Sequence, residues 1–412
     1  MNFEYFIAKR IIDSKAYKSS ISAPIIKIGI VAIALGIIVM MIAIATGMGL
    51  QQKIRDKVVA FNGHATISKY DTNNSQESEN PISINQDFYP DFNSVEGVTH
   101  VQGVATRYAV LRQPDTFEFV VIKGVGGDYH WQYLQEFLVE GVLPDYTKKR
   151  NEDLLISQYF AKRLNLKVGD KVNAYFLSKD SNKLPRPLAY SIVGIYNSGF
   201  KEFDQQFVIG DLKHIQRLNK WEPDQIGNFE VFIDDFDALD AKAIEIFKNT
   251  PSTLNTVSVK KKFGTIFEWI GIFDKNIIGI IGIMILVAGI NMVTALLVLI
   301  LERTQMIGIL KALGNSNNSI RKIFVYNATY LILVGLFWGN LIGLGLLYSQ
   351  KQFGFLSFPN PEEYYMTTIP VYINLDYIIL LNLGTFVLCL AMLLIPSYII
   401  TKISPVKAMR FE

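Results

Sequence analysis

The sequence predicts an α-helical membrane protein with four transmembrane helices and a large α+β domain between the first two. The chain of 412 residues is 50% hydrophobic and 19% charged, whereas a soluble protein usually carries about a quarter charged residues. The apolar residues gather in four blocks, each longer than the about 18 residues that a membrane-spanning helix needs. These blocks are Ile28–Gly49, Ile277–Leu301, Ile323–Tyr348 and Tyr377–Ile400.

The basic residues predict how the chain is oriented in the membrane. They precede the first block, lie between the second and third, and follow the fourth. Because cytoplasmic loops carry an excess of Lys and Arg, both termini and the middle loop are expected in the cytoplasm. The residues concerned are Lys9, Arg10, Lys15, Lys18, Lys27, Arg303, Lys311, Arg321, Lys322, Lys402, Lys407 and Arg410.

These two patterns divide the chain into segments. We expect a cytoplasmic amphipathic N-terminal helix (1–24), a first span (25–50), an extracytoplasmic stalk with an α+β domain (51–270), a second span (271–301), a cytoplasmic loop (302–322), a third span (323–348), an outer loop (349–376), a fourth span (377–400) and a cytoplasmic tail (401–412). The alternative for the first block is a cleaved signal peptide, with Ala43-Ile44-Ala45 as the cleavage site. Its basic leader and apolar run are too long for that, so an uncleaved helix is expected.

The N-terminal residues 3–12, FEYFIAKRII, have the amphipathic pattern of a helix on the inner leaflet. The alternative is a disordered basic tail, which the regular apolar spacing disfavours. Helical periodicity continues past the first span to Asn62-Gly63, and a matching extension, 263–276, precedes the second span. Two helices are therefore predicted to form a stalk.

Between the stalk helices the pattern becomes mixed α and β. Ser157 is a plausible helix cap and Gly169-Asp170 a β-turn. Residues 71–80 are polar and predict a loop. Strands are predicted at 64–70, 98–112, 117–125, 171–178, 189–196, 203–209 and 229–233, and helices at 157–164, 211–218 and 237–247.

The loop after the second span contains a short amphipathic segment. Met306, Ile309, Leu310 and Leu313 recur at helical spacing, and Gly314-Asn315 is a helix stop. From the pattern alone this is either an interfacial helix after a stop-transfer segment or a docking helix.

The segment ERTQMIGILKALG resembles the signature of ABC-transporter permeases of the lipoprotein-releasing, macrolide-exporter and FtsX-like group. Residues 154–172 resemble the MacB-like periplasmic core domain of these permeases, and 353–373 and 393–412 resemble their outer loop and ending. Family members often carry Arg or Lys where this chain has Gln305 and Met306. The resemblance implies a coupling helix that docks on a separate ATPase, with Glu302, Arg303, Met306, Ile307, Ile309, Leu310, Lys311, Leu313 and Gly314 as its residues.

The resemblance implies a permease subunit of the inner membrane that extracts lipoproteins and passes them to a periplasmic carrier. Its partners would be an ABC ATPase dimer, a second permease subunit, the lipoprotein substrate, the carrier and membrane lipids, with no nucleic acid. Whether the permease pair is a homodimer or a heterodimer stays open. The alternatives are an FtsX-like or macrolide-exporter-like permease that transmits motion to a periplasmic partner, and a membrane-anchored sensor.

Two further sites follow from the resemblance. Acyl chains would enter between the first and second spans, where methionine and aromatic side chains suit flexible lipids. The candidates are Met40, Met41, Ile44, Met48, Phe267, Ile270 and Phe273. A basic, proline-containing hairpin tip at 178–187 would hook the carrier through Lys183, Leu184, Pro185, Arg186 and Pro187. The alternatives are ordinary lipid-facing residues and an ordinary solvated loop.

Other chemistry is not indicated by the sequence. There is no P-loop, so ATP and Mg²⁺ would be bound by the partner ATPase, and no cofactor, metal site or enzymatic activity is expected in this chain. The four histidines lack metal-ligand spacing. In the third span, Gly335, Gly339 and Gly343 permit close helix packing within a bundle or a dimer, or simply reflect how common glycine is in membrane helices.

Overall fold

The computed structural model describes residues 3–13, 23–70, 75–176, 187–360 and 366–402. The chain divides into two compact units. We call residues 1–51, 269–356 and 369–412 the helical unit, and residues 52–268 and 357–368 the sheet domain. Helices α3 (Ala23–Asn62) and α10 (Gly264–Glu302) contribute residues to both units.

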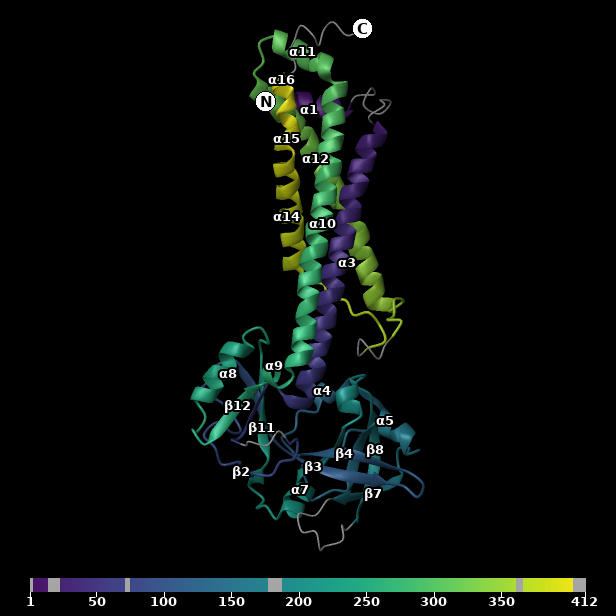
Figure 1. Ribbon diagram of the computed structural model, residues 1–412, viewed down its shortest axis with the longest axis vertical. Helices are drawn as coiled ribbons and strands as arrows, with labels where there is room; N and C mark the ends of the chain where they lie inside the picture. The colour runs from purple at the N-terminus through teal and green to yellow at the C-terminus, as the bar shows by residue number, and fades with distance from the viewer. Residues whose placement is uncertain (1–2, 14–22, 71–74, 177–186, 361–365, 403–412) are drawn as a thin grey trace. The chain divides into compact units, whose positions relative to one another are not determined.

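The helical unit contains the four apolar blocks that the sequence predicts as spans. Each block forms a helix that is long and apolar enough to cross a membrane. In Figure 1, α3, α10, α12 and α14 run side by side, and α1, α11 and α16 lie at one end of the bundle. Beside α3 and α10, the helices in the described part of this unit are α1 (Phe3–Asp13), α11 (Thr304–Ala312), α12 (Asn317–Phe353), α14 (Leu375–Met392), α15 (Leu394–Ser397) and α16 (Ile399–Lys402).

Glycine allows α12 to pack closely against α3. A Cβ atom added at Gly335 would lie 2.8 Å from the Ile33 Cβ, and one at Gly339 would lie 2.9 Å from the Ile37 Cβ. One turn further along α12, a Cβ atom added at Gly343 would lie 3.2 Å from the sulfur of Met41. Of the interpretations for this glycine row, the structure therefore supports close packing within the bundle.

The fourth predicted span differs from the expectation of one continuous helix to Ile400. Helix α14 ends at Met392, and the short helices α15 and α16 follow. Pro396 lies inside this stretch, and a proline has no backbone N–H for the helical hydrogen bond. The sequence prediction passed over that proline because the apolar run continues on both sides of it.

The sheet domain is built on a ten-stranded sheet with short helices around it. The strand order is β12-β1-β11-β3-β4-β9-β6-β8-β5, and β7 pairs with both β3 and β8. Strands β2 (Ile82–Ser83) and β10 (Gln225–Ile226) pair separately. The sheet consists of β1 (Ala65–Lys69), β3 (Val98–Arg112), β4 (Phe117–Val125), β5 (Leu138–Gly141), β6 (Asp153–Ser157), β7 (Lys171–Phe176), β8 (Pro187–Tyr196), β9 (Phe207–Asp211), β11 (Asn228–Ile233) and β12 (Leu254–Ser258).

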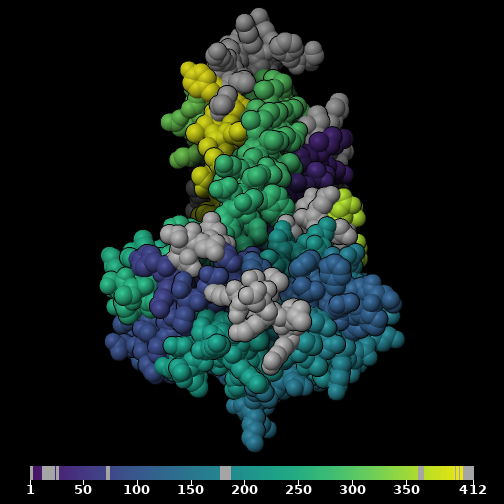
Figure 2. All heavy atoms as spheres, turned by 60° about the horizontal axis from the view of Figure 1, so that its bottom comes forward, coloured from purple at the N-terminus to yellow at the C-terminus, as the bar shows by residue number. Residues whose placement is uncertain are grey.

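The pairings join β3, β4, β9, β6, β8 and β7 into a closed ring, because β7 bridges the far strand β8 back to β3. Neighbouring strands are often far apart along the chain, and Figure 2 shows the blue and teal parts of the sequence interleaved on one face of this domain. The helices of the domain are α4 (Gln132–Gln135), α5 (Gln158–Arg163), α6 (Lys201–Asp204), α7 (Leu212–Asn219), α8 (Leu239–Lys248) and α9 (Val259–Lys262).

Most predicted elements of the sheet domain are present, with one error. The Ser157 side chain accepts from the Phe160 N–H and caps α5 as expected. Gly169 has φ +95°, and the Asp170 N–H donates to the Lys167 carbonyl, which is the predicted turn. The strand expected at 203–209 is wrong in its first half: residues 201–204 form α6, and β9 begins at Phe207.

A buried ion pair joins the end of α3 to the sheet. The Lys123 ammonium lies 2.7 Å from a carboxylate oxygen of Glu230 and donates to the carbonyl of Phe61 at 2.7 Å. Gln102 donates to the same carboxylate at 2.8 Å. Because Phe61 lies in the last turn of α3, Lys123 satisfies a carbonyl that the helix leaves without an internal partner.

Candidate functional site

Helix α11, predicted as the coupling helix, begins immediately after α10. Only Arg303, whose φ of −100° and ψ of 19° are not helical, separates the two helices. The Thr304 hydroxyl donates to the carbonyls of Leu301 at 2.6 Å and Ile300 at 3.3 Å in the last turn of α10. Such bonds from a threonine to the preceding turn bend a helix, so Thr304 helps set the direction of α11.

The other end of α11 is closed by the predicted helix stop. Gly314 has φ +87°, its N–H donates to the Lys311 carbonyl, and the Asn315 N–H donates to the Leu310 carbonyl. This pair of bonds is a Schellman motif, which requires the left-handed conformation that glycine adopts without strain. Both ends of α11 are therefore fixed by local hydrogen bonds.

The side chains of α11 divide into an inner and an outer face. Ile307 is fully buried, and Met306 and Leu310 pack against the apolar core of the helical unit. Ile309 is 47% exposed and Leu313 is 79% exposed. Met306 and Leu310 are covered by α1 and α12, so the apolar stripe is only partly exposed.

Lys311 connects α11 to the C-terminal part of the described chain. Its ammonium donates to the Ile400 carbonyl in α16 at 2.7 Å, and partial burial lowers the pKa of this lysine. Sequence analysis placed Lys311 at the site as a basic residue of the loop. Its bond to α16 had no sequence signal, because the two residues are 89 positions apart.

The seven residues predicted to line a lipid cavity lie in different surroundings. Met40 is fully buried and Ile270 nearly so, whereas Met48 and Phe273 are half-buried. The ring of Phe267, in the sheet domain, stacks on Phe236 with 5.7 Å between the ring centres. The remaining two, Met41 and Ile44, line one crevice of the helical unit.

That crevice is too small for an acyl chain. Met41 and Ile44 face Leu347 of α12 and Ile378 of α14 across a free volume of about 10 Å³. A cavity needs about 10–15 Å³ of such volume to hold even one water molecule. The crevice also lies beside α12 and α14, whereas the sequence analysis expected the cavity between α3 and α10.

Helices α3 and α10 approach each other closely between Gly29 and Gly47 of α3. A Cβ atom added at Gly29 would lie 3.3 Å from Ala295, and one at Gly47 would lie 2.5 Å from Ile277. The α3–α10 contact is thus closed in this structure. Both helices instead carry apolar residues on outward faces, with Leu35 and Ile283 more than half exposed.

The predicted carrier hook is described only at its base. Lys183, Leu184, Pro185 and Arg186 lie outside the described residues, and Pro187 is the first residue of β8. Strand β7 leads into the hairpin and pairs with β8 in antiparallel register from Lys171 to Tyr175. The two strands predicted to flank the tip are therefore confirmed.

An exposed apolar face extends from the base of this hairpin across β7, β3 and β4. In the sheet register, Tyr175 lies opposite Val110, which lies opposite Phe119. Phe119 is 69% exposed and Phe117, two residues earlier on the same face, is 60% exposed. This face was not predicted from the sequence. Its signal is that Phe117 and Phe119 alternate with Glu118 at the start of an otherwise buried strand.

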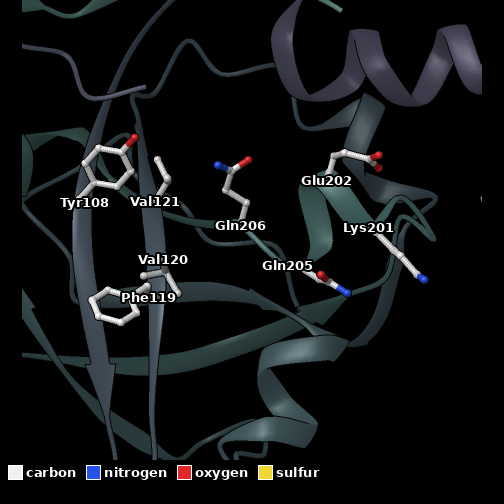
Figure 3. Close-up of a pocket in the computed structure, with 8 residues that line it drawn as sticks. All are labelled: Tyr108, Phe119, Val120, Val121, Lys201, Glu202, Gln205 and Gln206. Atoms are coloured by element: carbon white, nitrogen blue, oxygen red, sulfur yellow. The ribbon is translucent and has the colours of Figure 1, made fainter. Parts of the chain in front are cut away.

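Next to this face lies a shallow hollow of about 470 Å³ (Figure 3). Tyr108, Phe119 and Val121 line it from β3 and β4, Lys201 lines it from α6, and Gln205 lines it from just after α6. The mixture of aromatic and polar side chains suits a protein or peptide surface better than a small apolar ligand. Among the described residues, no group of His, Cys, Asp and Glu side chains could hold a metal ion.

Comparison with known families gives matches over most of the chain. Residues 28–246 match the MacB-like periplasmic core domain, and residues 278–405 match the C-terminal region of FtsX-like permeases. The first of these matches alone spans more than half of the chain. The chain belongs to the family of MacB-like permeases. Helix α11 lies inside the second match, between α10 and α12.

Curated relatives of this MacB-like permease match most of its length. It is 23% identical to the lipoprotein-releasing system transmembrane protein LolC of Haemophilus influenzae, over 92% of each chain. It is 21% identical to LolC of Xylella fastidiosa over 93% of each chain. The corresponding LolE of Haemophilus influenzae is 21% identical over 86% of this chain and 84% of its own length.

Proposed function

We propose that this MacB-like permease is a subunit of an ABC transporter that extracts lipoproteins from the inner membrane and hands them to a periplasmic carrier. The observation that supports this most strongly is the match to LolC over 92% of both chains, which leaves neither unit outside the alignment. ATP and Mg²⁺ are bound by a separate ATPase pair, and a second permease subunit, identical or homologous, completes the membrane part.

The test of this function is reconstitution. Proteoliposomes that contain the permease, its ATPase and a radiolabelled triacylated lipoprotein should release the lipoprotein to a soluble carrier when ATP is added. Release without ATP, or ATP hydrolysis without release to any carrier, would contradict the proposal. In the second case an FtsX-like role on a periplasmic enzyme would be favoured.

In this proposal the end of the bundle with α1, α11 and α16 faces the cytoplasm, and the sheet domain lies in the periplasm. The basic residues support this orientation: Lys9 and Arg10 belong to α1, Lys311 belongs to α11, and Arg321 and Lys322 belong to the first two turns of α12, which follows α11. The extended apolar surfaces of α3 and α10 then face lipid or the second permease subunit.

The outer face of α11 docks on the ATPase. Ile309 and Leu313 lie four residues apart, so their side chains are neighbours on the helix surface. Both are apolar and exposed, which is typical of a surface that binds another protein. The inner residues Met306 and Leu310 hold the helix in place. The assignment to docking therefore belongs to the outer face alone.

A pull-down tests this assignment. Leu313→Asp should abolish copurification of the ATPase while the protein stays folded, because the substituted side chain points away from the core. Phe353→Asp is the matched control: Phe353 is equally exposed, at 78%, and ends α12 at the opposite end. Unchanged ATPase recovery with Leu313→Asp, or equal loss with both variants, would contradict a docking role.

The acyl chains of the lipoprotein lie against the exposed faces of α3 and α10. Because the α3–α10 contact is closed and the crevice beside Met41 is small, an acyl chain at these two helices meets their outer faces. Each acyl CH₂ group removed from lipid costs about 0.8 kcal/mol unless it is buried again, so such a surface is required.

Photocrosslinking distinguishes this surface from ordinary lipid contact. A crosslinker at Leu35 or Ile283 should capture a triacylated lipoprotein. The same crosslinker at Phe337, exposed on α12, should capture phospholipid only. Capture from all three positions in equal yield would show that exposure alone decides the result.

The hairpin between β7 and β8, together with the exposed face beside it, binds the carrier. The tip is basic, and the neighbouring Phe117, Phe119 and Tyr175 offer aromatic anchors of the kind that dominate protein interfaces. Replacement of residues 182–187 by Gly and Ser should eliminate carrier binding and leave ATPase binding intact. Carrier binding at unchanged affinity would move the contact elsewhere.

A further inference from the structure

Helix α1 has two faces with different surroundings. Ala8 and Ile11, three residues apart, are buried, and Ile7 is partly buried beside them. On the opposite side Phe3 and Phe6 are exposed, at 49% and 40%, together with Lys9 and Arg10. Only the first face is explained by packing within the chain.

The inner face of α1 packs on α12 and on α11, the helix that forms the proposed ATPase contact. Ala8 and Ile11 cluster with Ile323 of α12, and the coupling-helix residues Met306 and Leu310 pack against the same cluster. A polar bond adds to this contact, since the Ser319 hydroxyl in the first turn of α12 donates to the Glu4 carboxylate at 2.8 Å. Any movement of α1 therefore changes what supports α11.

The outer face of α1 has the composition of a helix that lies on a membrane surface. Phenylalanine side chains enter the boundary between headgroups and acyl chains, while Lys and Arg reach the phosphates. The place of α1 agrees with this chemistry. It lies at one end of a bundle whose four long helices are apolar enough to span a bilayer (Figure 1).

We propose that the outer face of α1 binds the anionic headgroups of the bilayer and that this binding holds the coupling helix in its docking position. The inference rests on the proposed function, because the affected contact is the one between α11 and the ATPase. Lipid binding fixes α1, α1 fixes Met306 and Leu310, and these residues present Ile309 and Leu313 outward. The charge of the inner leaflet would thus regulate ATPase engagement.

The experiment places the full-length permease in two kinds of nanodisc. One contains only neutral phosphatidylcholine, and the other contains about a third anionic phosphatidylglycerol. The ATPase is then titrated into each, and its Kd is measured. We expect tighter binding in the anionic discs. The variant Lys9→Gln/Arg10→Gln should bind there as weakly as in neutral discs. At about 1 kcal/mol for each basic residue, the difference can reach about 30-fold in Kd. Lys351→Gln, which removes an exposed charge at the far end of α12, should behave as the unaltered chain.

A depth measurement separates the membrane from other occupants of this face. A spin label at Phe6→Cys, in a Cys389→Ala background, should be accessible to oxygen and shielded from a water-soluble relaxation agent in the anionic discs. Cys389 is the only cysteine of the chain, so the label is unique. A label shielded from both agents once the ATPase is added would show that a protein covers the face instead.

The possible failures are distinguishable. If the ATPase binds in neither kind of disc, the proposed function is wrong, because the permease then lacks an ATPase partner whatever the lipid. If the ATPase binds equally in both and the Lys9→Gln/Arg10→Gln variant changes nothing, the proposed function stands and the role of α1 is overturned. A water-exposed label at position 6 in both discs would overturn it as well.

Discussion

The helical unit and the sheet domain solve the same packing problem with opposite means. The helical unit brings α3 and α12 together by leaving side chains out, at Gly335, Gly339 and Gly343. The sheet domain instead encloses a charged pair, Lys123 and Glu230, and satisfies it with hydrogen bonds. The stability of the helical unit should therefore be sensitive to added side-chain volume, and that of the sheet domain to the loss of polar partners.

The largest effect is expected from Lys123→Met in the sheet domain. It leaves the Glu230 carboxylate buried without its cation and the Phe61 carbonyl without a donor. Removal of one partner from a buried ion pair costs about 3–5 kcal/mol. Hydrogen exchange of the β4 and β11 amides in the full-length protein measures the loss. The double variant Lys123→Met/Glu230→Gln should recover part of it, and a cost below about 1 kcal/mol for the single change would refute the comparison.

Acid should destabilise the sheet domain through His64. Burial lowers the pKa of His64 to about 4, from an ordinary value of 6.5, and its Nδ1 accepts from the Ile233 N–H. The unfolded chain therefore binds more protons between these pH values, so stability is complete above pH 6.5 and falls towards pH 4. The loss approaches about 3 kcal/mol. His64→Gln keeps a hydrogen-bond acceptor, and it should make the denaturation midpoint of the protein depend less on pH over that range. If the stability of this variant falls with acid as in the unaltered chain, groups other than His64 cause the acid dependence.

In the helical unit, Gly339→Ala is expected to destabilise by about 1–3 kcal/mol, since overpacking forces the backbones of α3 and α12 apart. The new methyl group would meet Ile37 at 2.9 Å and the Ala34 carbonyl at 3.0 Å. Gly345→Ala is the control on the same helix, because nothing lies within 4 Å of that position. Thermal unfolding in detergent compares the two. Equal midpoints would mean that the glycine row does not determine packing.

The smallest effect is expected where the helical unit uses polar side chains. Asn340 and Asn382 exchange hydrogen bonds of 2.6 and 2.9 Å between α12 and α14. Such bonds contribute about 0.6 kcal/mol, and at most about 1.7, inside a membrane protein. Asn340→Leu should therefore cost about as much, whereas Thr294→Val, which loses only a bond to its own helix, should cost less. If Asn340→Leu lowered the stability as much as Lys123→Met, the two units would not differ in their sensitivity to lost polar partners.

The sequence predicted the helices better than the sheet, for a physical reason. A long apolar run needs no knowledge of its neighbours, so α3, α10 and α12 were found from the pattern alone. Strands such as β5, β6 and β12 were missed, because a short strand is stabilised by partners that lie far away in the chain, as β12 is by β1. The break at Pro396 was missed because hydrophobicity does not report hydrogen bonds.

The candidate site shows the same division. The ends of α11 were predictable, since Thr304, Gly314 and Asn315 act on residues close in sequence. Which of its apolar residues face outward was not, because α1 and α12 decide it from other parts of the chain. An apolar stripe at helical spacing indicates burial, but it does not separate a face that packs within the chain from one that awaits a partner.

The glycine row of α12 also has a genetic consequence. Every missense change at a glycine codon adds at least a Cβ atom, so no allele at Gly335 or Gly339 can avoid contact with Ile33 or Ile37 of α3. A saturation library selected for growth should therefore be depleted of all substitutions at these two codons. Gly345, in the same helix and open on its side, should retain many of them. Second-site suppressors of Gly339→Ala should arise as smaller residues at position 37, which would identify the α3–α12 contact in living cells.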